Sequence, residues 1–335
     1  MEKQTDFQEK TRVSEAFAIC RVLAILSVIV AHTPFPVEAG SVADELLTAL
    51  GSIGVVMFFV ISGYYFNPEK YGTLRAFFKP RLVTLVVPWL FVGSLIYIES
   101  ALVSGQGLSF LSYGRFLVGH GSYLYYLPVL LVCFLVYFYP VKKGKIHLTC
   151  AISVALTVLS LQLTAFGVLD ATRIGLTDYL NVFNWIGYFC IGVWLKRSNV
   201  YRLMAWCRRF LWVLLPLYVG IFALSFFVIG DRIGYFSYLG MPLQLIGVMI
   251  VMGVCSWKWM NNRVFRYVSR ASFGVYLVHM FTFAVVDKFV GTVPVVCFAA
   301  PLITLSVTTF GFWLLDLLAR KIKFMKWVLP LVGMR

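Results

Sequence analysis

The sequence predicts an all-α membrane protein: a polytopic helix bundle with about ten transmembrane helices, forming a single domain over residues 1–335. Three observations support this fold class. Of the 335 residues, 61% are hydrophobic and 13% are charged, and the mean hydropathy is +0.87. Apolar segments of about 20 residues, long enough to cross a bilayer, recur along nearly the whole chain. Basic residues gather in every second gap between these segments, as short loops of membrane proteins do on the cytoplasmic side.

The apolar segments number ten, and the separators between them are short, polar or rich in Gly and Pro. No repeat and no low-complexity linker divides the chain, so we expect one domain. The first segment is too long for the apolar region of a signal peptide and lacks a small-x-small cleavage site, which predicts an uncleaved helix. The predicted spans are residues 16–35, 46–66, 82–104, 120–140, 146–166, 179–196, 209–230, 237–256, 271–291 and 293–318.

The formal net charge of +15 is divided unevenly between the two sets of gaps. Twenty-four of the 29 Lys and Arg residues lie in the two terminal tails and in alternate gaps. The other gaps hold Arg115, Arg173, Arg232 and Lys288, and Arg21 alone lies inside a span. By the positive-inside rule, both termini are predicted to be cytoplasmic. Membrane topology explains the basic composition, so we expect membrane lipids as surroundings and no nucleic-acid partner.

The seven cysteines lie within spans or on the predicted cytoplasmic side, and no Cys-x-x-Cys pair occurs. A disulfide framework or a thiolate metal site is therefore not expected. We predict no metal and no bound cofactor.

Arg21 and His32 are the most informative polar residues, because ionisable groups inside spans are costly and often functional. Eleven residues at about 100° each place them on one helix face, about 16 Å apart along the axis. Taken singly, Arg21 could snorkel to the interface and His32 could be an ordinary histidine at a helix end. Together they indicate a polar passage, with a cation at its inner end and a base that titrates near neutral pH at its outer end.

His279 is the second histidine inside a span, about two turns in from the predicted cytoplasmic face, with Tyr276 on the same side at i−3. It either takes part in the chemistry or makes an interhelical hydrogen bond that specifies packing. His147 and His120 are weaker candidates, because one borders a lysine cluster and the other opens a span at the outer surface.

Ser62 and Gly63 end the second span, and small residues there favour close helix packing. A Gly-x-Ser-x-Gly elbow is absent and no acid is near in sequence, so Ser62 is not predicted to be a nucleophile. Arg75, Lys79 and Arg81 precede the third span. They either mark topology or grip the phosphate groups of a cytoplasmic ligand.

Four motifs occur in order: Arg21-x10-His32, Phe58-Phe-Val-Ile-Ser-Gly-Tyr64, Phe77-Phe-Lys-Pro-Arg81-Leu-Val-Thr-Leu-Val-Val-Pro88 and Ser272-Phe-Gly-Val-Tyr-Leu-Val-His279. In content and spacing they resemble the bacterial integral membrane acyltransferase-3 family. Two features depart from that family's pattern. Ala18 stands where relatives often have Asp, and Leu124-Tyr-Tyr-Leu127 stands where they often have Leu-Trp-Phe-Leu. These departures bear on fine substrate contacts rather than on the chemistry.

The resemblance implies an O-acyltransferase of the bacterial cytoplasmic (inner) membrane. It would move an acyl group, commonly acetyl from acetyl-CoA, to a sugar hydroxyl of a surface polysaccharide or lipid-linked glycan. Acyl-CoA would then be a donor substrate bound from the cytoplasm. The resemblance further implies that His32 is the essential catalytic histidine and Arg21 its essential partner. We expect the substrates to contact Arg81, Arg75, Lys79, His279, Tyr276 and Ser62.

Other function classes remain open at this point. A transporter or flippase for a glycan or lipid-linked intermediate would also use intramembrane Arg and His, although no pair of broken helices at matching positions supports it. A glycosyltransferase would need outer carboxylates, and Asp44, Glu45, Asp170 and Asp178 are available. A scaffold gives no reason for Arg21 and His32 to align. Within an acyltransferase, His32 could act as a base or carry the acyl group covalently.

Overall fold

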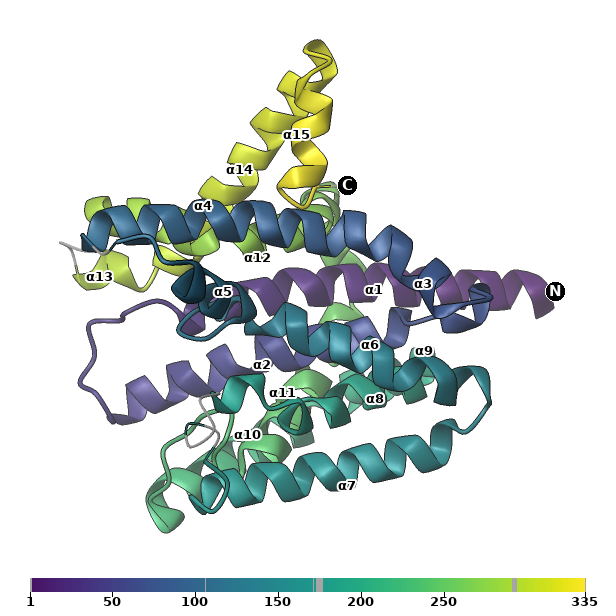
Figure 1. The fold of residues 1–335 in the computed structure, drawn as a ribbon. Coiled ribbons are helices and arrows are strands. Elements are labelled where there is room, and N and C mark those ends of the chain that lie inside the picture. Colours follow the sequence, from purple (N-terminus) through teal and green to yellow (C-terminus); the bar gives the residue numbers. More distant parts are fainter. Residues whose placement is uncertain (1, 106, 171, 173–176, 291–293, 335) are drawn as a thin grey trace.

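The structure is a computed structural model that describes residues 2–105, 107–170, 172, 177–290 and 294–334. Arg173 and Arg335, two of the basic residues counted above, lie outside the described residues. The described part is built from helices and contains no strand, which confirms the all-α fold class (Figure 1).

The α-helices are α1 (Glu2–Ala31), α2 (Val42–Tyr65), α3 (Leu74–Arg81), α4 (Val87–Ser104), α5 (Phe110–Val118), α6 (Tyr126–Lys142), α7 (Ile146–Ala165), α8 (Ile186–Leu195), α9 (Val200–Arg209), α10 (Leu211–Ala223), α11 (Gly240–Cys255), α12 (Arg263–Val290), α13 (Pro294–Cys297), α14 (Ala300–Lys321) and α15 (Met325–Leu331). Short 3-10 helices are η1 (Pro68–Lys70), η3 (Tyr123–Tyr125), η5 (Asp178–Leu180), η6 (Val182–Asn184) and η8 (Lys258–Met260). Two π-helical turns, η2 (Leu82–Val86) and η7 (Leu224–Ile229), continue longer helices.

Among the described residues, eight helical segments are long and apolar enough to cross a membrane, and each coincides with a predicted span. The other two predicted spans, 179–196 and 237–256, contain the shorter apolar helices α8 and α11. Polar side chains shorten the α-helix in the predicted span 179–196. Asn181 accepts a hydrogen bond from the backbone of Phe183 at 3.1 Å, and Asn184 donates to Asp178 O at 3.0 Å. Such local bonds compete with α-helix, so residues before α8 form 3-10 turns.

The first span ends four residues earlier than predicted, at Ala31. Pro34 disfavours helical geometry at the residue before it. The Thr33 hydroxyl donates to Ile29 O at 2.8 Å and so satisfies a carbonyl at the helix end. His32 therefore lies in the turn that directly follows α1, with its backbone N–H bonded to Ile29 O at 3.1 Å.

Gaps that the charge pattern assigns to the same side lie at the same end of the bundle. We call the end where α1 and α12 begin and α6 finishes the basic end (Figure 1). Contacts between gaps there are Arg12 Nη1 to Tyr201 OH at 2.9 Å, Lys142 Nζ to Tyr71 O at 2.9 Å, and the Arg197–Glu69 ion pair at 2.7 Å. At the opposite end Gln162 donates to Tyr238 O at 2.9 Å. The predicted alternation thus corresponds to two physical ends.

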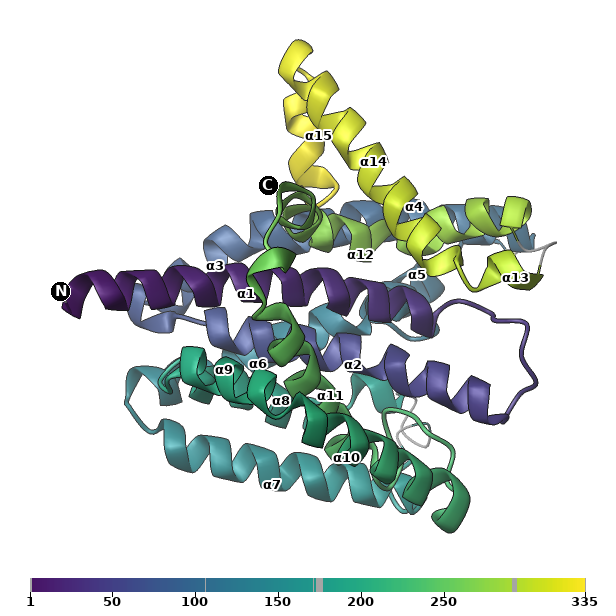
Figure 2. The ribbon, with the colours of Figure 1, turned by 180° about the vertical axis from the view of Figure 1, so that it is seen from behind.

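The last basic cluster is placed differently. Helix α14 leaves the other helices at a steep angle and α15 folds back toward them, as both views show (Figures 1 and 2). Arg320 and Lys321 therefore end a projecting arm instead of joining the other clusters at the basic end. Arg320 is paired with Asp316 at 2.8 Å. After α15 the chain returns to the bundle, where Gly333 packs against Phe273.

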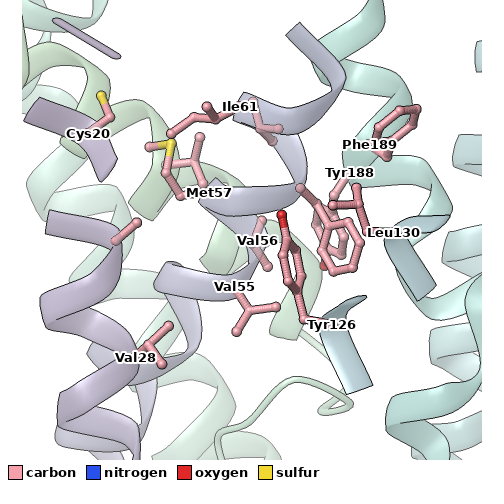
Figure 3. Packing of buried hydrophobic residues seen from close by; sticks show 14 of the residues in the cluster. Cys20, Val28, Val55, Val56, Met57, Ile61, Tyr126, Leu130, Tyr188 and Phe189 are labelled. Carbon is pink, nitrogen blue, oxygen red and sulfur yellow. The ribbon is translucent and has the colours of Figure 1, made fainter. Parts of the chain in front are cut away.

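Helix α2 is the centre of the packing and makes extensive contacts with α1 and with α8. Figure 3 shows its buried side chains, including Val56 and Met57, between α1 on one side and Tyr126 and Phe189 on the other. Small residues allow this close approach. Gly63 faces the backbone carbonyl of Phe189, and Gly192 of α8 faces that of Val60.

We predict that Gly63→Ala destabilises the protein by about 1–3 kcal/mol, because a methyl group there collides with backbone that cannot turn away. The thermal unfolding midpoint in detergent should fall. Gly220→Ala in α10 is the matched control, since nothing lies within 4 Å of the added atom. A Gly63→Ala variant that unfolds at the wild-type temperature would contradict the close crossing of α2 and α8.

Candidate functional site

Four of the residues singled out in the sequence line one cavity of about 620 Å³, which we call the central cavity. They come from distant parts of the chain: Arg21 from α1, Ser62 from α2, Arg81 from the end of α3, and Tyr276 from α12. No Asp or Glu is among the described residues that line it. The cavity is therefore cationic, and it lies among helices whose sequence separation exceeds 200 residues.

Arg21 is half-buried, and no acid for an ion pair is among the described residues that line the cavity with it. Its guanidinium group lies over the ring of Tyr65, 4.8 Å from the ring centre. A cation over an aromatic face is stabilised without being neutralised. Arg21 therefore keeps its positive charge available to an anionic group in the cavity.

Ser62 does not have the surroundings of a nucleophile. Its hydroxyl is 2.9 Å from that of Tyr126, and no histidine is among the described residues that line the cavity. A hydroxyl pair of this kind lacks a base that could accept the serine proton. Ser62 is thus a polar group in the cavity lining, and its not being a nucleophile stays a prediction.

The three basic residues before the third span separate in the structure. Arg81 lies over the ring of Phe77, 3.5 Å from its centre, and Nη1 donates to Phe77 O at 2.6 Å. This fixes its guanidinium at the cavity wall, beside the π-helical turn η2. Arg75 and Lys79 are exposed and line none of the cavities described here. Only Arg81 of the three therefore belongs to the site.

The two intramembrane histidines meet at the far side of the cavity wall. The ring centres of His32 and His279 are 5.4 Å apart, and the ring of Tyr123 lies 5.9 Å from His32 and 4.8 Å from His279. His279 is fully buried, whereas His32 is half-buried. Helix α12 begins at Arg263, so His279 is about 24 Å along it from the basic end. The helix starts eight residues before the predicted span, and the depth of His279 below the membrane face stays a prediction.

One hydrogen bond fixes the orientation of the His279 ring. Its Nδ1 is 2.7 Å from the backbone carbonyl of Tyr276. A carbonyl oxygen can only accept, so Nδ1 carries the proton of this bond. Nε2 is buried and has no hydrogen-bond partner among the described residues. In the neutral ring, Nε2 is therefore an unused acceptor beside His32.

A layer of tyrosines separates the central cavity from the two histidines. Tyr276 packs against Tyr126 at 5.7 Å and against Tyr123 at 5.8 Å between ring centres. Two bonds hold the layer: the Tyr276 hydroxyl donates to Tyr123 O at 2.6 Å, and the Tyr123 hydroxyl donates to Leu277 O at 2.5 Å. The cationic cavity and the imidazole pair are thus neighbours, with these tyrosine rings between them. Together they offer an anion-binding region and a proton acceptor at different depths.

A family model described as an acyltransferase domain matches residues 15–320. The chain belongs to the acyltransferase-3 family. No curated protein and no solved structure matches it. The matched range includes every candidate residue from Arg21 to His279. Of the function classes that the sequence left open, membership in this family supports an acyltransferase, and the apolar helices indicate a multi-pass membrane protein.

Sequence reasoning missed two parts of this acyltransferase. One part is the pair Tyr123 and Tyr126, which the sequence indicated only as lying in or beside a departure from the family pattern. The available signal was that tyrosine hydroxyls at the start of an apolar span need partners. Arg263, Arg266 and Arg270 were counted only as topology markers. Their spacing of i, i+3 and i+7, which places them on one face of a helix, was the signal available.

Proposed function

We propose that this acyltransferase moves an acetyl group from acetyl-CoA, bound at the basic end, to a sugar hydroxyl that enters from the opposite end. The acceptor is a surface polysaccharide or a lipid-linked glycan. One observation carries the proposal: a cationic cavity and a half-buried histidine lie on the two sides of a tyrosine layer inside a membrane bundle. Donor and acceptor can then approach the reacting atoms from different sides of the membrane.

The membrane orientation follows from charge. Basic gaps lie at the end where α1 begins, and the positive-inside rule places that end in the cytoplasm, here of a bacterial inner membrane. The N-terminus is then cytoplasmic, and the C-terminal basic arm is assigned to the same side. Cytoplasmic acetyl-CoA has access to the central cavity, while surface-bound sugars reach His32.

The central cavity suits the donor. Its volume of about 620 Å³ lies within the range of small-molecule sites. Its lining combines apolar side chains for a pantetheine arm with Arg21 and Arg81 for polar oxygens. Helix α1 rises about 15 Å from Arg21 to its last residue, directly before His32, which is about the reach such an arm requires.

His32 serves as the base. It takes the proton from the sugar hydroxyl as that oxygen attacks the thioester carbonyl carbon. The tetrahedral intermediate then collapses with cleavage of the carbon–sulfur bond, and the CoA thiolate recovers the proton from His32. The acetyl ester and free CoA are the products, and His32 returns to its neutral form. His279 is a positioning residue in this scheme, because its ring packs on His32 while Nδ1 is held by Tyr276 O.

The tyrosine layer has to open during each turnover. In the described conformation Tyr126 and Tyr276 stand between the cavity and the histidines. Movement of these rings lets the thioester pass from the cavity to His32. Closure afterwards keeps water and ions from crossing the bundle.

The test is acetyl transfer in membranes that contain the protein. We expect label from acetyl-CoA, carried in the acetyl group, to appear in an ester on the host glycan fraction. Surface glycans from cells with and without the gene should differ by the mass of one acetyl group for each modified sugar. Membranes without the protein are the control. Movement of a glycan across proteoliposomes with no transfer of label would instead assign the protein to the flippases.

A further inference from the structure

A second cavity, of about 680 Å³, opens at the basic end between α1 and α12, and we call it the arginine pocket. Four of its lining residues are arginines: Arg21 from α1 and Arg263, Arg266 and Arg270 from α12. The rest of its lining is uncharged, with serine and tyrosine hydroxyls among it, and no acid lines it among the described residues. Four arginines thus line one cavity, and the described residues of its lining include no acid to balance their charge.

Among the described residues, the contacts of Arg266 and Arg270 are with neutral groups. Arg266 Nη1 bonds to the neutral amide of Asn261 at 3.1 Å, and Arg270 lies 5.4 Å from the ring centre of Tyr267. The carboxylate of Asp316 interacts electrostatically with Tyr267, but it forms an ion pair with Arg320 at 2.8 Å. The pocket therefore retains a strong positive potential for a mobile anion.

Membrane topology alone does not account for this arrangement. The positive-inside rule needs basic residues at this end but does not require them to converge on one cavity. Arg263 and Arg266 lie in the first turn or so of α12, where the helix dipole disfavours cations, and Arg270 follows about one turn later. Convergence of like charges at an unfavourable helix end is costly unless a ligand supplies negative charge.

The arginine pocket adjoins the central cavity. Arg21, Ser269 and Arg270 line both. A ligand with a multiply charged head and a long neutral arm can thus place its head among the arginines and its arm in the central cavity. This division follows the chemistry of CoA, whose phosphates lie at its nucleotide end and whose pantetheine arm is uncharged.

We propose that the arginine pocket binds the phosphorylated adenosine end of CoA, with Arg263, Arg266 and Arg270 as its phosphate contacts. The inference rests on the proposed use of acyl-CoA as donor. It moves the phosphate contacts away from Arg75 and Lys79, which are exposed and outside both cavities. Arg81 lies too far into the wall of the central cavity to belong to this pocket and instead borders the arm.

The test measures binding, so that it does not depend on acyl transfer. Purified full-length protein in neutral detergent is titrated with CoA and with adenosine 3′,5′-bisphosphate, which has no arm and no acyl group. We expect Arg266→Gln to weaken binding of both ligands about tenfold to a hundredfold, as loss of a charge-assisted phosphate contact does. Arg266→Lys should recover part of the loss. The dependence of affinity on salt should become shallower in Arg266→Gln, which a merely structural defect does not predict.

Arg209→Gln is the matched control, because Arg209 is an exposed arginine at the basic end outside both cavities. It should bind both ligands as the wild type does. If wild-type protein binds CoA and Arg263→Gln, Arg266→Gln and Arg270→Gln all bind it equally well, the pocket assignment is overturned while the proposed function stands.

Anionic lipid headgroups present the same phosphate chemistry at this end of a membrane protein. Vesicles of anionic and of neutral phospholipid form a second arm of the experiment. Competition of the bisphosphate by anionic vesicles, with CoA binding unaffected by the arginine variants, would assign the pocket to lipid and overturn the nucleotide assignment. Binding of the bisphosphate in neutral lipid, lost in Arg266→Gln, supports it.

Discussion

Replacing His32 by Ala is expected to reduce acyl transfer by a factor of about 10² to 10⁴, the usual contribution of a general base. His32 lies next to His279 in the turn after α1, on the side of the tyrosine layer away from the central cavity. Its ring is half-buried, whereas that of His279 is fully buried, so an acceptor entering from that end can reach His32 rather than His279. Donor binding should be unaffected, because His32 does not line either donor cavity.

Initial rates of label transfer from acetyl-CoA check this expectation, with membrane insertion and unfolding temperature compared in parallel. His147→Ala is the control, since His147 is exposed at the start of α7. It should transfer at the wild-type rate. A well-inserted His32→Ala protein with wild-type activity would exclude His32 as the base.

The same variant separates the two chemical routes. If His32 is a nucleophile, labelled acetyl should accumulate on wild-type protein when the acceptor is omitted and be absent from His32→Ala. If His32 acts as a base, neither protein should become labelled under these conditions. The half-burial of the ring in this structure is compatible with both routes.

Arg21→Ala is expected to lower kcat/KM for acetyl-CoA by about 10²-fold or more. Arg21 is shared by the central cavity and the arginine pocket, so its loss removes a cation from both parts of the proposed donor site. Loss of one hydrogen bond from a charged side chain to a phosphate or carbonyl oxygen typically weakens binding by about tenfold to a hundredfold. Folding should be preserved, because removing a charge from a membrane span does not make insertion less favourable.

Kinetics with acetyl-CoA as the varied substrate, together with thermal unfolding, test this prediction. Arg21→Lys keeps the charge but not the planar fork, so we expect it to retain part of the activity. Arg209→Ala, at an exposed site on α9, should behave as the wild type. Full activity in Arg21→Ala would mean that the charge over Tyr65 serves packing alone.

The helical content and the order of the spans were predictable because lipid imposes a simple condition on sequence. Each crossing needs a long apolar run with its backbone bonds satisfied internally, and this leaves a local signal. The signal failed where local polar groups intervene. Asn181 and Asn184 divert the start of one predicted span into 3-10 turns, and Pro34 ends α1 before the predicted boundary.

The candidate site was predictable only in part. Arg21 and His32 stood out because both are ionisable groups in one apolar helix, and their spacing could be counted. His279 was predictable as a second histidine in an apolar segment, although α12 continues beyond its apolar part toward the basic end. Its contact with His32 depends on how α1 and α12 pack side by side, and no local pattern encodes that.

The sequence by itself determined the all-α membrane class, the places of most spans, the division of most basic residues between two ends, and the apolar segment that contains Arg21 and His32. These properties depend on hydropathy, charge and helical periodicity, which are local. Only the tertiary structure decided that His279 adjoins His32, that a tyrosine layer separates them from the central cavity, and that Arg266 and its neighbours meet Arg21 in one pocket. Such pairings depend on close packing between distant helices, where lipid-facing and buried apolar residues look alike in sequence.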